Sequence, residues 1–567
     1  MEEKTINFFE NYIFTVEFNF HDKDLTGILT IKQAGMLTLK IHTNDHNLLF
    51  GEHSSIETPI ICQEIGSSKT FTLHCLELQR GGVIICEFVT TGGLITHDID
   101  QIEICLTGVS TWFERLRANE ITETEFKRYT HVDKFLVDFS HDGEDYSIEN
   151  QRHISATPIT PIEHQLKIQD SFLVKKKSGS FTLEMAENIA LEIRNLFSLL
   201  LGHSLSIKQL YLIPSKSRHS YQSVIFSSVN YEEEPFSYYS DTLCRFDDVL
   251  GWNLWEPIVK NFFKIESFRT IWNRLVPSLS SLQYGFWEYD ILSVVVTLEM
   301  YCTKVSKGKG HHLNKNNFNE LKSELLKTLD NFINNQSSSS DEKCVLNGIK
   351  TAISGLKNTS HPTLQQKYDY LMSKTNPEIR EAISFSDIDF TILKKIRNSA
   401  AHGENHRTEI PNDITKEIQI KDRLLTLLMY FVFNELGFND RQIAQNFSRT
   451  HNPFIVNAGG NERTRDKLAG FSKFIILHEE VDLNDYKPHD YIALNYKSSL
   501  NQYTLNKDLS YEIKHNWHDS GIGDIRDFVR SLLQTDSNTD LNYVSKLYIT
   551  SGTDEKCYYG AIVLTDK

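Results

Sequence analysis

The period of the hydrophobic pattern changes along this chain, and the change limits the folds that the chain can adopt. Between residues 12 and 106, Met36 to Ile41 alternates clearly, and further strand-like runs such as Val83 to Val89 continue the series, with glycine-containing or polar turns between them. Alternation at this spacing predicts strands of an antiparallel sandwich or a barrel-like domain. From residue 247 to 445 the apolar residues recur instead with a helical period, which predicts a helical bundle.

The pattern predicts a multidomain α+β protein. We expect a β-rich N-terminal sensor or regulatory domain over residues 1–245, an all-helical domain over 246–445 and a small α/β accessory module over 446–567. One helix, 183–201, interrupts the β-rich part, and another, near 524–534, lies in the last module. In the helical domain the expected helices are 255–275, 287–305, 316–334, 343–357, 363–374, 386–401 and 413–436.

Composition narrows the class of partner and the compartment. A net charge of −16 argues against a surface that coats nucleic acid non-specifically, although it leaves room for a small basic pocket. Eight scattered cysteines without a C-x-x-C pair predict buried, reduced thiols. The longest apolar runs, such as 427–433, are too short to span a bilayer, and the N-terminus lacks the pattern of a signal peptide. We therefore expect a soluble, cytoplasmic protein that has no membrane partner.

One segment of the helical domain carries candidate chemistry. In Leu393 to Gly403 the sequence is L-K-K-I-R-N-S-A-A-H-G, at the end of an amphipathic helix. Its predicted inward stripe is Ile388, Ile392, Ile396 and Ala400, widened by Leu393. A glycine follows the helix and a second strong helix returns, so Arg397 and His402 are expected at the tip of a helical hairpin. On spacing alone, an ordinary solvated arginine and a loop histidine explain the pair better than an active site does; the small residues between them and the hairpin tip favour the active site.

The string R-N-S-A-A-H-G resembles the active-site signature of the HEPN ribonucleases. The layout, a β-rich domain before a helical one, resembles more closely the ApeA-like anti-phage (abortive infection) proteins, over roughly residues 5–440. The segment from Leu292 to Tyr301 is similar to an early HEPN helix that carries a Leu-Glu pair. It departs from that pattern where it continues Cys302-Thr303-Lys304, so Glu299 has either a supporting or a purely structural role.

The resemblance implies an endoribonuclease that needs neither metal nor another cofactor and uses the ribose 2′-hydroxyl as the nucleophile. His402 would transfer the proton, and Arg397 would stabilise charge on the phosphoryl oxygens. Asn398 would orient His402 or hold a phosphate oxygen. Lys394 and Lys395 would bind substrate, or would be ordinary solvated helix charges.

Geometry adds a condition to this hypothesis. Five residues on an ideal helix turn through about 140°, so Arg397 and His402 do not converge on a straight helix. Either the helix ends before His402, or two copies meet and share sites, and the HEPN resemblance implies the second arrangement. We therefore expect a homodimer or higher homo-oligomer that acts on RNA, such as tRNA, and responds to a phage-derived trigger.

Other candidates are weaker. Arg194-Asn195 and His203 echo the motif but flank a predicted core helix. The pairs His311-His312 and His515-x-x-His518 have no neighbouring ligands, so no metal site is expected. The alternative function is a non-catalytic ligand-binding or scaffold protein that dimerises through its helical domain.

Overall fold

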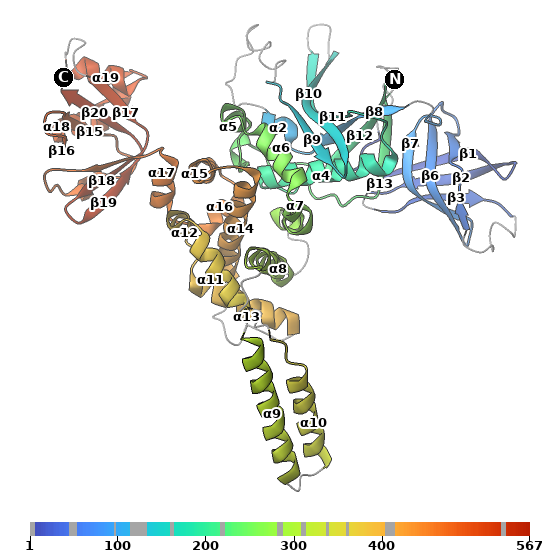
Figure 1. Ribbon diagram of the computed structural model, residues 1–567. Helices are drawn as coiled ribbons and strands as arrows, with labels where there is room; N and C mark the ends of the chain where they lie inside the picture. The colour runs from blue at the N-terminus through green and yellow to red at the C-terminus, as the bar shows by residue number, and fades with distance from the viewer. Residues whose placement is uncertain are drawn as a thin grey trace.

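A computed structural model describes most of the chain. The described residues are 6–33, 35–44, 54–95, 98–113, 133–158, 164–215, 221–280, 287–307, 313–335, 340–358, 362–402, 414–533 and 540–566. A β-rich N-terminal part precedes a helical middle and a small C-terminal module with two sheets (Figure 1). The predicted multidomain α+β class is confirmed.

The N-terminal strands form a closed barrel. Its six strands are β1 (Tyr12–Phe20), β2 (Lys23–Ile31), β3 (Leu37–His42), β5 (Ile60–Glu64), β6 (Thr70–Gln79) and β7 (Val83–Thr91). Because β6 pairs with both β5 and β7, the ring closes, and a short strand β4 (Ser54–Ile56) adds to β6. In β1 the buried residues Val16, Phe18 and Phe20 alternate with exposed ones, which is the period that the sequence predicts for a strand with one face on a core.

The same sheet continues beyond the barrel through β7. The added strands are β13 (Gln222–Phe226), β12 (Ile207–Pro214), β8 (Ile99–Leu106), β11 (His164–Lys176), β10 (Glu144–Pro158) and β9 (Leu136–His141). Helix α4 (Leu183–Leu201) packs on β8 and β12, and its Phe197 stacks on Phe172 with 4.0 Å between ring centroids. The Thr182 side chain caps the helix, and Gly202, with a φ of 72°, ends it.

The next segment joins the β-rich part to the helices. It contains η1 (Tyr239–Asp241), α5 (Phe246–Gly251), α6 (Trp255–Lys264), α7 (Glu266–Thr270) and η2 (Trp272–Leu279). The short helix α2 (Val109–Phe113), from earlier in the chain, packs against η1. Trp255 stacks on Phe135 at 4.0 Å, and Phe263 stacks on Phe139 of β9 at 4.2 Å. These rings belong to a hydrophobic core that runs without interruption from the barrel into the helical region.

The prediction of a single helix over 255–275 is wrong, because the helix is interrupted twice there. Ile265 adopts an extended conformation, with φ −85° and ψ 114°, and Ile271 departs from helical angles as well. In one straight helix Phe268 would point about 140° away from Phe263. The break returns Phe268 to the core, where its ring lies 5.0 Å from that of Phe262.

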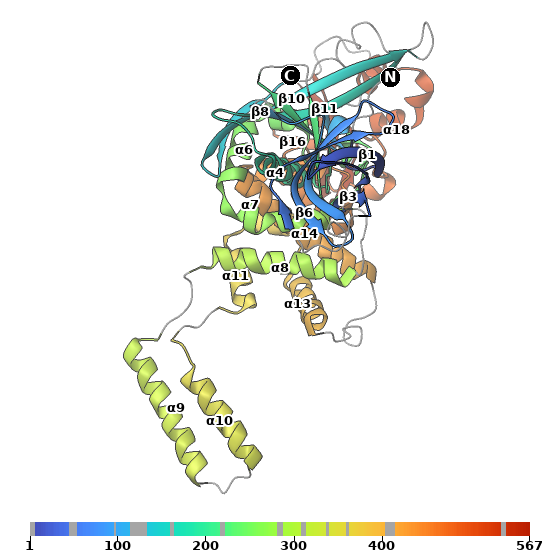
Figure 2. The same cartoon turned by 90° about the vertical axis from the view of Figure 1, so that its right-hand side faces the viewer.

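The helical middle follows the predicted boundaries closely. Its helices are α8 (Trp287–Val305), α9 (Lys315–Asn335), α10 (Ser340–Ser354), α11 (Leu364–Lys374), α12 (Pro377–Ile383), α13 (Asp387–His402), α14 (Ile414–Leu436), α15 (Asp440–Arg449), α16 (Pro453–Ala458) and α17 (Glu462–Ala469). Helix α14 is buried over most of its length and packs against α4, α6, α8, α13, α15 and α16. Helices α9 and α10 form a hairpin that projects from this body (Figures 1 and 2).

The C-terminal module has cores of its own. One sheet contains β14 (Lys473–Ile476), β18 (Leu547–Ser551) and β19 (Asp554–Tyr558), and the other contains β16 (Gln502–Leu505), β15 (Ile492–Lys497), β20 (Ala561–Asp566) and β17 (Asp540–Val544). The remaining elements are η4 (Leu483–Asp485), α18 (Lys507–Asn516), η5 (His518–Ser520) and α19 (Ile525–Leu533). The two apolar clusters of this module are separate from the main core.

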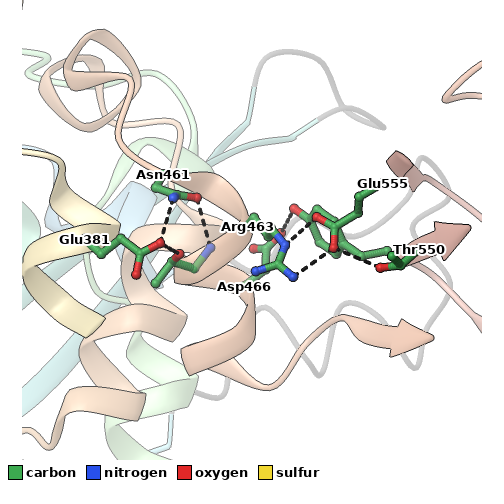
Figure 3. A network of polar contacts seen from close by, with 8 residues as sticks. Glu381, Asn461, Arg463, Asp466, Thr550 and Glu555 are labelled. Carbon is green, nitrogen blue, oxygen red and sulfur yellow. Dashed lines mark hydrogen bonds and ion pairs between the residues drawn. The ribbon is translucent and has the colours of Figure 1, made fainter. Parts of the chain in front are cut away.

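Polar side chains attach this module to the helical region through α17, as Figure 3 shows. Arg463 binds Glu555 of β19 through two nitrogens, with 2.8 Å between Nη2 and Oε2. The Tyr548 hydroxyl donates to Asp466 at 2.9 Å. On the opposite side of α17, Asn461 donates to Glu381 of α12 at 3.2 Å. The short helix α17 therefore connects α12 to the C-terminal sheets.

Two predictions from composition can be compared with the described residues. Five of the eight cysteines are buried, whereas Cys75 and Cys344 are exposed and Cys557 is half-buried, so the expectation of buried thiols holds only in part. No helix within the described ranges has both the length and the apolar character needed to cross a membrane.

Candidate active site

Helix α13 is anchored by one apolar edge. Phe390, Leu393 and Ile396 recur every three residues and are almost completely buried. The Phe390 ring stacks on Tyr368 of α11, with centroids 3.9 Å apart and planes 5° from parallel. The predicted stripe is wrong at Ile388, which is 71% exposed, because the helix is rotated to place Phe390 against α11.

This rotation directs the Arg397 side chain from α13 toward α8. Its Nη2 donates to Oε2 of Glu299 at 3.0 Å, and its Nη1 donates to Oδ1 of Asn398 at 3.1 Å. The Arg397 and Glu299 side chains are 32% and 34% exposed, so the pair lies at the surface of the bundle and not in its core. The guanidinium is held in a fixed direction while part of it remains open to solvent.

The two lysines predicted to bind substrate lie within one turn before the arginine. The Lys394 ammonium donates to the Gln365 side chain of α11 at 3.2 Å and lies 5.8 Å from the Phe390 ring centroid. Lys395 is exposed on the other side of the helix. Within the described part of the chain, neither lysine has a carboxylate within ion-pair distance. Among the residues that the structure describes, no acidic side chain therefore neutralises their positive charge.

The sequence alone did not point to a third cation at this place. Lys367 of α11 donates to Thr303 of α8 at 3.0 Å, one helical turn after Glu299. Among the described residues it also has no acidic partner. Lys367 lies 30 residues before Arg397 and beyond the α9–α10 hairpin, so only the packing of α11 on α8 brings it to the site. Behind it, burial raises the pKa of the Cys302 thiol to about 12, so this cysteine remains protonated.

The structure excludes the first of the two geometric alternatives, in which the helix ends before His402. Helix α13 continues through His402, so it does not end before that residue. The positions of Arg397 and His402 are therefore about 140° apart around one helix. The side chains of residues 400–402 and the whole of 403–413, including Gly403, lie outside the described residues.

The weaker sequence candidates take ordinary places in the fold. Arg194 lies on the core helix α4, as expected, and donates to the Val229 carbonyl at 3.3 Å. His203 is buried behind the same helix and contacts the Asp241 carbonyl at 2.9 Å. The described residues contain no group of three or more side chains suited to a metal ion. His311 and His312 lie outside the described residues.

Comparison with known families bears on the N-terminal part. Residues 12–253, which comprise the barrel, the extended sheet, α4 and the whole of α5, match the family model ApeA N-terminal domain 1. This part of the chain is therefore similar to the N-terminal domain of the ApeA proteins. The match supports membership of an anti-phage family, and it ends before α8, so the HEPN assignment of the helical region remains a prediction. Comparison with the curated proteins and with the solved structures found no match.

Proposed function

We propose that this protein is an ApeA-like anti-phage endoribonuclease of the HEPN type, whose helical domain cleaves host or phage RNA during infection without a metal cofactor. The observation that carries the proposal is the cationic surface where α8, α11 and α13 meet. There Arg397 is oriented by Glu299, and Lys367 and Lys394 contact only neutral partners among the described residues.

The chemistry fits cleavage by the ribose 2′-hydroxyl. In that reaction the 2′-oxygen attacks the adjacent phosphorus, a cyclic phosphate forms, and the 5′-oxygen of the next nucleotide leaves with a proton. A fixed guanidinium can donate two hydrogen bonds to the phosphoryl oxygens as charge accumulates on them. A histidine can accept the first proton or supply the second. Arg397 and His402 are assigned these roles, with Asn398 orienting one of them.

The acidic composition of the chain limits where RNA can bind. With a net charge of −16, most of its surface repels a polynucleotide. The three lysines and Arg397 would bind the backbone only at this site. We therefore expect cleavage at few positions in a structured RNA.

A cleavage assay tests the proposal. Purified protein is incubated in EDTA with total cellular RNA, with and without lysate of phage-infected cells, beside Arg397→Ala and His402→Ala. Fragments with 5′-hydroxyl ends from the wild type alone support the proposal. Equal cleavage by the variants, or no cleavage under any condition, contradicts it.

The Glu299–Arg397 ion pair also favours the alternative, in which Arg397 only links α13 to α8 in a scaffold. A scaffold would keep its protection against phage in Arg397→Lys, which retains the charge. A ribonuclease would lose it, because lysine cannot make two parallel hydrogen bonds to one phosphate. Plaque counts on cells that express each variant decide between the two.

A further inference from the structure

The α9–α10 hairpin is a helical arm without a core of its own. None of its described side chains is buried, although α9 and α10 carry many large apolar residues. The arm is held together by the pairing of its two helices, by an ion pair of 2.6 Å between Lys350 and Asp330, and by two hydrogen bonds between Leu313 and Asn358 at its base. Short helices in water owe most of their stability to packing of an apolar face.

The apolar side chains form two stripes. The less exposed apolar residues of α9, which we take to mark the side of α10, are Phe318, Leu326, Leu329 and Ile333. About 90° around the helix from them lies a second, exposed set. Its members are Leu321, Leu325 and Phe332, which are 47%, 41% and 49% exposed.

The second helix repeats this arrangement. In α10 the less exposed apolar residues are Leu346 and Ile353, and Val345 and Ile349, which are 64% and 44% exposed, lie about 70° from them in the same rotational sense. Because the two helices are antiparallel, the same sense of rotation places both exposed stripes on one face of the arm. We name Leu321, Leu325, Phe332, Val345 and Ile349 the apolar face.

Charge suits the apolar face to self-association, and its area corresponds to a small interface. At these exposures the five side chains present about 400 Å² of apolar surface, roughly half of what one partner buries in a standard interface. Residues 315–354 contain five lysines and five acidic residues, so the arm has no net charge, whereas the whole chain carries −16. Two copies of the chain repel each other elsewhere, and this repulsion is absent at the arm.

The candidate site indicates the direction in which two arms would lie. The arm leaves the body between the end of α8 and the start of α11, the helices that carry Thr303 and Gln365 beside the site. Two arms pointing the same way would bring two α13 helices together. Arms pointing in opposite directions would separate them by about the length of α9, roughly 31 Å.

We propose that the apolar face binds the apolar face of a second copy of the chain, so that two arms lie side by side, point in the same direction and form a four-helix bundle. The pairing rests on the apolar face itself. The common direction rests in addition on the proposed function, because a helix that continues through His402 needs the second copy to complete a site with Arg397.

Sedimentation velocity tests the pairing on the full chain. We expect the wild type to be a dimer at micromolar concentration, and Leu325→Glu/Phe332→Glu to shift it to monomer with unchanged helical content by circular dichroism. The matched control, Ser323→Glu/Asn331→Glu, adds the same two charges on other faces of α9 and should remain dimeric. A monomeric wild type, or a dimer that survives the first variant, overturns the proposal.

Crosslinking tests the direction independently of ribonuclease activity. In a background with Cys75, Cys344 and Cys557 changed to serine, Val345→Cys near the tip and Leu321→Cys near the base should each crosslink to its own copy with a short bismaleimide. A dimer in which neither position crosslinks overturns the common direction. Arg397→Ala should dimerise and crosslink like the wild type, so loss of RNA cleavage in that variant concerns only the proposed function.

Discussion

Removing the Glu299 carboxylate separates a positioning role of this residue from a structural one. In Glu299→Ala the Arg397 guanidinium loses its 3.0 Å hydrogen bond but keeps the one to Asn398. Because both members of the ion pair are about one-third exposed, their interaction is screened by water and contributes only about 0.2–1 kcal/mol to stability. For a region of 150–250 residues that corresponds to a fall in Tm of about 0.4–4 °C.

Cleavage should respond more strongly than stability. A guanidinium that is free to rotate must be ordered again in each transition state, so we expect kcat to fall ten- to a hundredfold, about 1.4–2.7 kcal/mol. The measurements are initial rates on the preferred RNA and thermal unfolding of the same preparation. Glu256→Ala, which removes the exposed pair with Lys260 on α6, is the matched control and should leave the cleavage rate unchanged.

The opposite pattern would contradict a positioning role for Glu299. A loss of about 3 kcal/mol or more in stability, with an unchanged cleavage rate, would mean that Glu299 and Arg397 form a structural link of the buried kind. Glu299→Gln refines the result, because its amide oxygen can still accept the hydrogen bond and should restore part of the rate.

Three further predictions concern the fold. Phe390→Ala removes the ring stacked on Tyr368 and should lower the free energy of unfolding by about 3–5 kcal/mol in urea titrations, with equal loss of α13 protection in hydrogen exchange. Gly202→Ala places a Cβ 2.4 Å from the Leu243 side chain at a φ of 72° and should destabilise by about 2–4 kcal/mol, whereas Ala at the open, exposed Gly251 should cost less than 1 kcal/mol. Burial lowers the pKa of His203, so on acidification the histidine is protonated in the unfolded state before the folded state. The free energy of unfolding should therefore fall as the pH drops below about 6.5, and it should fall less in His203→Asn. Equal pH dependence of stability in both proteins would contradict this role of His203.

The sequence predicted the elements of this fold better than their interruptions. Helix α8 has the predicted bounds because its apolar residues follow one period from Trp287 to Val305. The breaks at Ile265 and Ile271 were missed, since each is decided by which phenylalanine rings meet in the core and not by a local breaker residue. Helix α12 was missed because its seven residues are too few to show a period.

The candidate site was predictable only where it is local. Arg397 and Asn398 are neighbours in the chain, and their contact follows from the motif. The rotation of α13 was not predictable, because Ile388 and Phe390 are equally apolar and only the ring of Tyr368 on α11 selects the second. Lys367 was missed for the same reason, since its approach to Thr303 depends on the packing of α11 on α8.

The distribution of the cores determines where this chain can be cut or recombined. A junction near residue 245 would divide one continuous core and expose rings such as Trp112 and Trp255 on either side, so the β-rich part and the helices must be inherited together. The C-terminal module packs around separate clusters and is held at α17 by side-chain bonds such as that of Arg463 with Glu555. A junction just after α17 therefore leaves both pieces with intact interiors. Relatives of this chain should accordingly exchange their C-terminal modules more freely than any other part.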